Sequence, residues 1–184
     1  MGEVVWGINC TLDGRCGHED GIADEALHRE AAESFAQCDT LLLGRITYEL
    51  MFPYWATVAE DQSDTPEVNA FAVAMTEVPK VVFSRTLDQA GWNTRVVSSS
   101  PVDEVRRLRD EGARMNLGAS PALAVQLREA GLIDRFHFVL HPVVAGRGPK
   151  LFGDNESIAM TLNSSALLPA GQMVLDYTVT HEDG

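Results

Sequence analysis

Three short segments of the sequence combine the residue types that bind phosphate groups. Glycine lets a phosphate approach the backbone closely, arginine offers a fork of donors, and serine or threonine adds a hydroxyl. Taken singly, each segment is also consistent with a turn glycine beside a solvated arginine; their repetition favours anion binding. The residues are Gly44, Arg45 and Thr47; Ser84, Arg85 and Thr86; and Gly118, Ala119 and Ser120, with Leu123 following.

Each segment comes at the end of a short apolar run, which is typical of a strand covered on both faces of a parallel sheet. The three runs are residues 40–44, 80–84 and 114–118. Helix starts are marked by Asp24 and by the pairs Thr65-Pro66, Ser100-Pro101 and Ser120-Pro121.

Two late segments, residues 135–141 and 173–180, alternate between apolar and polar residues with a period of two. This pattern suits antiparallel strands at the edge of the sheet. The sequence therefore predicts an α/β fold whose central sheet is mostly parallel, with antiparallel C-terminal edge strands and helices on both faces. We expect one domain over residues 1–184.

Ligands of open α/β sheets bind beyond the carboxyl ends of the strands. The three segments should therefore meet in one elongated site. An arginine held beside a serine or threonine suits a ribose 2′-phosphate, which favours NADPH over NADH as the bound nucleotide.

The charge balance limits the kinds of partner that the protein can bind. Fourteen lysines and arginines against 27 aspartates and glutamates give a net charge of −13, which repels nucleic acid and anionic membranes. Three cysteines without a CxxC pair fit a reducing compartment, and no leader or apolar span is evident at the N-terminus, so we expect a cytoplasmic protein that binds a small molecule.

Six segments in register resemble the bacterial dihydrofolate-reductase-like proteins related to the C-terminal reductase domain of the bifunctional riboflavin-biosynthesis deaminase/reductase. The resemblance implies a dihydrofolate-reductase-like fold that binds NADPH through the three segments above, and a homodimer. Ala119 and Pro121 depart from the tighter glycine pair common in that family. The segments are TLDG, LLLGRITYELM, YW, KVVFSRTL, LGASPALA and GLIDRFHFVLHPVVAGRGPKLF.

The substrate end is less clearly marked. In dihydrofolate reductases a carboxylate of the first helix binds the pteridine, and an ungapped count places His28 there, so folate reduction is not inferred. Asp13 is a candidate catalytic residue that could relay a proton, or else a simple turn residue. Tyr48 and Trp55 are candidates to stack on the substrate, or else core residues.

The later part of the sequence holds two further groups of polar residues. His137 and His141 should share one face of a strand, and without an evident third ligand we expect no metal site. Arg147 and Lys150 could hold a substrate anion or be surface charges.

The expected activity is hydride transfer from NADPH to a small heterocycle or carbonyl, of the pteridine or ribosylaminopyrimidine type. The alternative is a nucleotide-binding or ligand-binding protein of the same fold without turnover, which the missing helix carboxylate favours.

Overall fold

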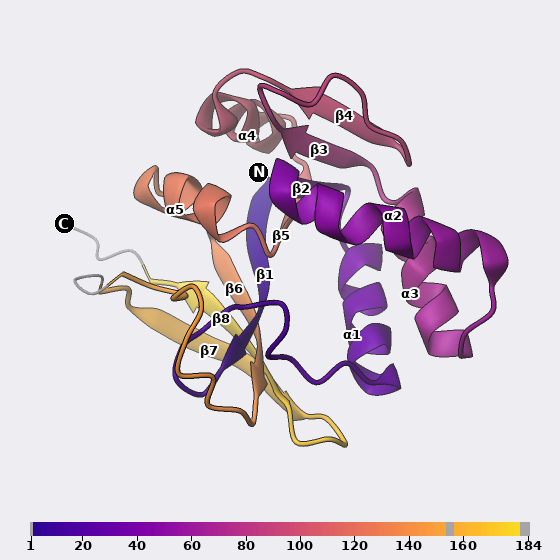
Figure 1. Cartoon of the computed structure of the whole chain (residues 1–184). Helices are drawn as coiled ribbons and strands as arrows, with labels where there is room; N and C mark the ends of the chain where they lie inside the picture. The colour runs from indigo at the N-terminus through magenta and orange to yellow at the C-terminus, as the bar shows by residue number, and fades with distance from the viewer. Residues whose placement is uncertain (1, 154–156, 181–184) are drawn as a thin grey trace.

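The computed structural model describes residues 2–153 and 157–180. Its strands form one eight-stranded sheet in the order β4-β3-β2-β5-β1-β6-β8-β7 (Figure 1). The strands are β1 (Glu3–Thr11), β2 (Thr40–Gly44), β3 (Lys80–Phe83), β4 (Thr94–Val97), β5 (Arg114–Gly118), β6 (Arg135–His141), β7 (Met160–Leu167) and β8 (Met173–Val179). The helices are α1 (Glu25–Ala36), α2 (Arg45–Asp61), α3 (Pro66–Glu77), α4 (Pro101–Asp110) and α5 (Pro121–Glu129).

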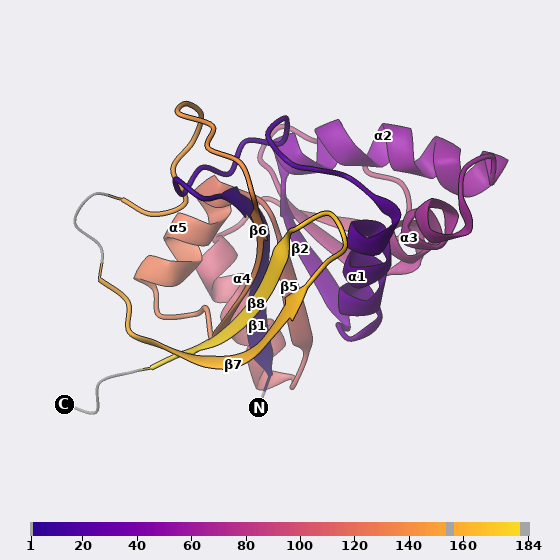
Figure 2. The same cartoon turned by 90° about the horizontal axis from the view of Figure 1, so that it is seen from below.

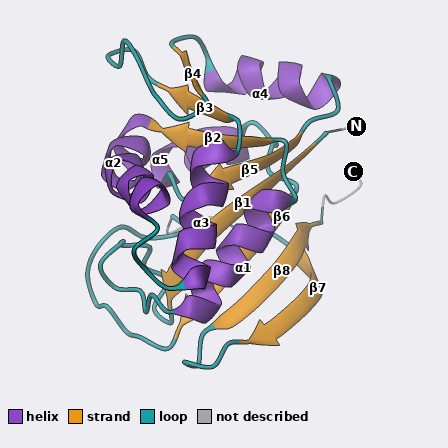
Figure 3. Cartoon of the chain, turned by 90° about the vertical axis from the view of Figure 1, so that its right-hand side faces the viewer, coloured by secondary structure: helices purple, strands orange, loops and turns teal. Residues whose placement is uncertain are grey.

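The predicted fold class is confirmed. The six strands from β4 to β6 run parallel to one another, whereas β8 is antiparallel to both of its neighbours. Helices α4 and α5 cover one face of the sheet, and α1, α2 and α3 cover the other (Figures 2 and 3). None of the described helices has both the length and the apolar character needed to span a bilayer.

The placement of the last strands was predicted wrongly in part. β6 is not an antiparallel edge strand, because it pairs in parallel with β1 in the interior of the sheet. Its alternation arises because Phe136 and Phe138 pack into the core while His137 and His141 line a cavity on the opposite face. β8 is antiparallel as expected, but the edge is taken by β7, whose polar and exposed side chains gave no strand signal.

Each face of the sheet has its own core. On the α4 and α5 side the buried side chains surround Trp6 and Phe136, whose ring centroids lie 5.6 Å apart. On the other side they surround Phe52 and Met75, both fully buried. Burying such large apolar side chains stabilises each by roughly 1.5–3 kcal/mol, so both helical layers are held firmly against the strands.

The predicted helix starts are found, but only some of their side chains act as caps. The Asp24 carboxylate accepts a hydrogen bond from the Leu27 N–H at 2.8 Å, and the Ser100 hydroxyl caps α4. Thr65 and Ser120 precede a proline at the first helical position without capping their helices. The hydroxyl of Ser120 is therefore available for another role.

Candidate active site

A cleft of about 710 Å³ lies beyond the carboxyl ends of β2 and β3 and at the start of α5. Thr86 lies outside it, where its N–H donates to the Ser84 hydroxyl at 3.1 Å. Gly118 and Ala119 line a second cavity instead. Seven of the predicted cofactor residues line the cleft: Gly44, Arg45, Thr47, Ser84, Arg85, Ser120 and Leu123.

Ser120 ties two of the three segments together. Its hydroxyl accepts a hydrogen bond from the Gly44 N–H at 2.9 Å and donates one to the Thr47 hydroxyl at 3.0 Å. This geometry requires a left-handed turn, with φ of 45° at Ala119 and 44° at Ser120. The Trp6 indole N–H holds that turn by donating to the Ala119 carbonyl at 2.7 Å. The turn is fixed by the core before any ligand binds.

The cleft gathers groups that favour an anion. Helices α2 and α5 both begin there without a side-chain cap, so the positive ends of their dipoles act at the cleft. Arg45 is engaged with Glu49 at 2.6 Å. The exposed Arg85 side chain forms no hydrogen bond or ion pair anywhere in the described chain, so Arg85 is the cation most readily available to a ligand.

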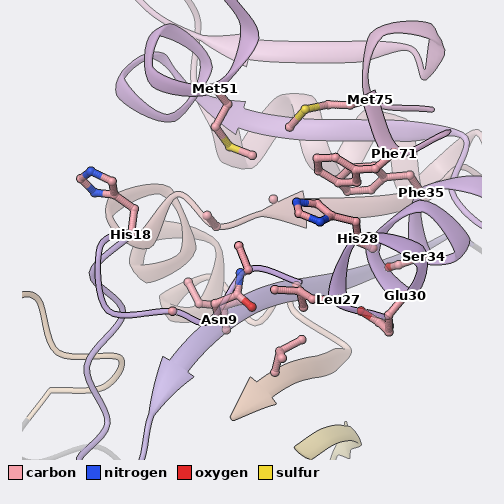
Figure 4. Close-up of a pocket in the computed structure, with 18 of the residues that line it drawn as sticks. Asn9, His18, Leu27, His28, Glu30, Ser34, Phe35, Met51, Phe71 and Met75 are labelled. Atoms are coloured by element: carbon pink, nitrogen blue, oxygen red, sulfur yellow. The ribbon is translucent and has the colours of Figure 1, made fainter. Parts of the chain in front are cut away.

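The second cavity, of about 360 Å³, lies between the sheet and helices α1, α2 and α3 (Figure 4). It adjoins the cleft, because Leu43 and Ala119 line the cavity while the next residues in the chain, Gly44 and Ser120, line the cleft. Met51 and Met75 lie along one wall and Phe71 and Phe35 beside them (Figure 4).

The structure brings Trp55 to this cavity but not Tyr48. The Trp55 ring lies 4.6 Å from that of Phe71 and 5.4 Å from that of His28, so it forms part of the aromatic wall. Tyr48 lies about two turns earlier in α2 and is buried in the core, where its hydroxyl accepts from the Gly91 N–H at 3.0 Å. Tyr48 lines neither cavity.

Asp13 is likewise outside both cavities. Its carboxylate accepts hydrogen bonds from the Thr11 hydroxyl at 2.6 Å and from the N–H groups of Ala145 and Gly146 at 3.0 and 2.8 Å. These bonds lower the pKa of Asp13 to about 2, with the Thr11 bond the largest cause. The structure places Asp13 in a hydrogen-bonded turn rather than at either cavity, and a catalytic role for Asp13 stays a prediction.

A histidine that can act as an acid, His137, lines the second cavity. His137 Nε2 is 2.7 Å from the Glu30 carboxylate, and His137 Nδ1 is 3.5 Å from that of Asp176. Burial alone lowers the pKa of His137, but the hydrogen bonds and charges of Glu30 and Asp176 outweigh it, and the pKa is raised. Arg135 in turn holds Asp176 at 2.6 Å. The arrangement can store a proton at the cavity wall.

Two further polar residues line the cavity, His141 and Asn116, and they differ in whether their polar atoms have hydrogen-bond partners. His141 is buried and neutral: burial lowers its pKa, its Nδ1 accepts from the Ile22 N–H at 3.0 Å, and its Nε2 contacts the Asn9 amide oxygen at 3.1 Å. Asn116 is only 4% exposed; its amide nitrogen donates to Ser34, whereas its amide oxygen has no partner. That oxygen is almost fully enclosed, so it is a buried polar atom without a partner.

Sequence reasoning missed Glu30 and Asn116. An ungapped count placed His28 at the position of a helix carboxylate, yet Glu30, two residues later, also faces the cavity. The available signal was the cavity-facing stripe of α1, in which Leu27, Glu30 and Ser34 recur at helical spacing. Neither Arg147 nor Lys150 lines either cavity.

Residues 3–174 match the RibD C-terminal domain family. The chain belongs to this family. It is 27% identical over 155 residues to the uncharacterized protein YyaP of Bacillus subtilis (strain 168), covering 82% of this chain and 80% of that one.

Two solved structures share the fold. A pyrimidine reductase-like protein from Corynebacterium diphtheriae superposes with a TM-score of 0.66 at 13% identity, covering 98% of this chain and 92% of the other. RibD from Acinetobacter baumannii superposes with a TM-score of 0.66 at 14% identity, covering 98% of this chain. The chain spans 58% of the length of that RibD.

Proposed function

We propose that this protein is an NADPH-dependent reductase that transfers hydride to a small heterocyclic or carbonyl substrate. The observation that carries the proposal is the junction of two cavities at the strand ends: an anion-binding cleft and an aromatic cavity that meet at Gly44 and Ala119. A dinucleotide needs the first for its phosphates, and a hydride acceptor needs the second beside the nicotinamide. Membership of the RibD C-terminal domain family supports a reductase of this type.

In this proposal, different groups of the protein bind different parts of the cofactor. The uncapped starts of α2 and α5 bind the pyrophosphate, and Arg85 binds the 2′-phosphate. Gly118 lines the second cavity, into which the nicotinamide would project; a Cβ there would come within 3.1 Å of Leu41 and Leu43. The bound cofactor supplies the hydride.

A reduced C=N or C=O group also takes up a proton. We assign its delivery to the pair Glu30 and His137, because both line the cavity, lie within hydrogen-bond distance at 2.7 Å, and the pKa of His137 is raised. Acceptors of the pteridine and ribosylaminopyrimidine types both carry such groups. The binding-protein alternative drew its support from a missing helix carboxylate, and Glu30 now provides one in the cavity.

A cytoplasmic location and a homodimer are also part of the proposal. The acidic charge and free cysteines support the first. The exposed edge strand β7, with Leu162 and Leu167 exposed by 50% and 71%, supports the second. Light scattering after size-exclusion chromatography measures the oligomeric state directly.

The test is NADPH oxidation, followed by absorbance, with a panel of pterins, quinones and dicarbonyls. The proposal predicts tight NADPH binding and turnover with at least one of these acceptors. NADPH binding without oxidation by any of these acceptors would favour a binding protein without turnover. Failure to bind NADPH would reject both the reductase and the nucleotide-binding alternative.

A further inference from the structure

The cavity beside the cleft offers little positive charge to a ligand, because His137, whose pKa is raised, is already paired with Glu30 and Asp176. Within the described residues, no arginine or lysine side chain lines it. Arg29, which follows His28 in α1, points elsewhere and pairs with Glu67 at 2.9 Å. Arg15 is held by the Gly148 carbonyl at 3.1 Å, also outside the cavity. A phosphate monoester placed here would find no counter-ion.

The charge that does line the cavity is negative. The Glu30 carboxylate uses one oxygen for His137, and its second oxygen forms no hydrogen bond in the described chain. A phosphorylated substrate would therefore lose its hydration and face a carboxylate in a partly buried site, which costs several kcal/mol per unpaired ion. Repulsion by the protein's net charge of −13 adds to that cost.

The polar atom left open in the cavity is an acceptor, the second oxygen of Glu30. A ligand that donates a hydrogen bond to this carboxylate gains a charge-assisted hydrogen bond. The amide oxygen of Asn116 also lacks a partner, but it is almost fully enclosed, and Gly7 packs against it: a Cβ at Gly7 would meet it at 3.3 Å.

The remaining walls fit a flat ring. Phe35, Phe71 and Trp55 present aromatic faces and edges, and Met51 and Met75 add polarizable thioethers. The volume of about 360 Å³ lies near the lower end of the range for small-molecule sites, roughly 300–1,000 Å³. A compact ring system fits this space better than one that carries a charged ribose phosphate.

We infer that the substrate of this protein is a compact, unphosphorylated flat ring whose polar edge donates a hydrogen bond to Glu30. This inference rests on the proposed function, because it treats the cavity as the substrate site of a reductase. It distinguishes between the two substrate types considered above, because the ribosylaminopyrimidine type carries a phosphate, for which Arg147 and Lys150 were one possible counter-charge.

Matched pairs of ligands test the inference. The protein is saturated with NADP⁺, which binds without turnover, and calorimetry compares a ribosylaminopyrimidine with its 5′-phosphate and a hydroxymethylpterin with its phosphate ester. The unphosphorylated member of at least one pair should bind about tenfold or more tightly than its ester, because the ester loses hydration without gaining a counter-ion. Equal or tighter binding of both esters would overturn the inference, as would the absence of binding by both unphosphorylated compounds.

Two variants show whether Glu30 causes the discrimination. Glu30→Gln removes the charge with little change in shape and should reduce the preference for the unphosphorylated member by about threefold or more. Glu33→Gln is the matched control, because it lies on the exposed side of the same helix and should leave the preference unchanged. Equal effects of the two substitutions would refute the role of Glu30.

The titration of NADP⁺ alone comes first, because it tests the proposed function separately from the substrate inference. If NADP⁺ does not bind, the proposed function fails. If it binds and the esters are preferred, only the substrate inference fails.

Discussion

Replacing Arg85 by alanine should separate NADPH from NADH. The Arg85 side chain is exposed, lines the cleft and has no partner in the described chain, so nothing within the protein competes for it. A hydrogen bond to a charged group contributes about 1.5–3 kcal/mol. Screening at an exposed site reduces this to about 1–2 kcal/mol, since surface ion pairs are weakened by solvent and salt. At about 1.4 kcal/mol per tenfold, NADPH should bind about 5- to 30-fold more weakly.

The assay is a fluorescence titration of both nucleotides at low and at physiological salt. NADH affinity should change by less than about twofold, because NADH has no phosphate at this position, and the loss for NADPH should shrink as salt rises. Arg147→Ala is the control, because it removes the same charge from a residue that lines neither cavity. Equal losses for the two nucleotides, or an equal effect of Arg147→Ala, would refute the assignment of the 2′-phosphate to Arg85.

Three further substitutions test other parts of the site. His137→Gln should lower kcat by about a hundredfold or more with little change in NADPH affinity, because it removes a general acid; in the unaltered protein kcat should fall as pH rises through the raised pKa of His137, and a flat pH profile would contradict this role. Ser120→Ala leaves the Gly44 N–H without its acceptor and should lower the free energy of unfolding by about 1–3 kcal/mol, measured by urea denaturation; an unchanged midpoint would count against it. Ala119→Gly should raise the free energy of unfolding by up to about 1 kcal/mol, and with it the melting temperature, because glycine adopts a φ of 45° without strain. A lower melting temperature would show that the side chain matters more than the backbone.

The cofactor side of the site could be predicted because its signals are local. Each apolar run ends directly on its polar residues, and the parallel sheet then brings the carboxyl ends of neighbouring strands together. The register places Gly44 beside Phe83, immediately before Ser84, on adjacent strands. Gly118 also occurs at a strand end, but it lines the second cavity rather than the cleft, and its missing Cβ leaves room for Leu41 and Leu43. The sequence could not show this division between two adjoining spaces.

The substrate side is assembled from segments far apart in the chain, and local reasoning failed there. Glu30 and His137 meet across 107 positions, and Asp13 is held by partners more than 130 positions away. Neither contact leaves a pattern in the sequence. Position along α2 decided the outcome for the aromatic pair: Tyr48 and Trp55 lie on nearly the same side of the helix, about two turns apart, and Trp55 is the one that lies beside the cavity.

A crystal structure of the protein with bound NADPH tests the central claim most directly. The account predicts the pyrophosphate at the starts of α2 and α5, the 2′-phosphate within hydrogen-bond distance of Arg85, and the nicotinamide ring at Ala119, open to the cavity of Glu30 and His137. A nucleotide bound outside the cleft, or one with its nicotinamide end at Arg85, would contradict it.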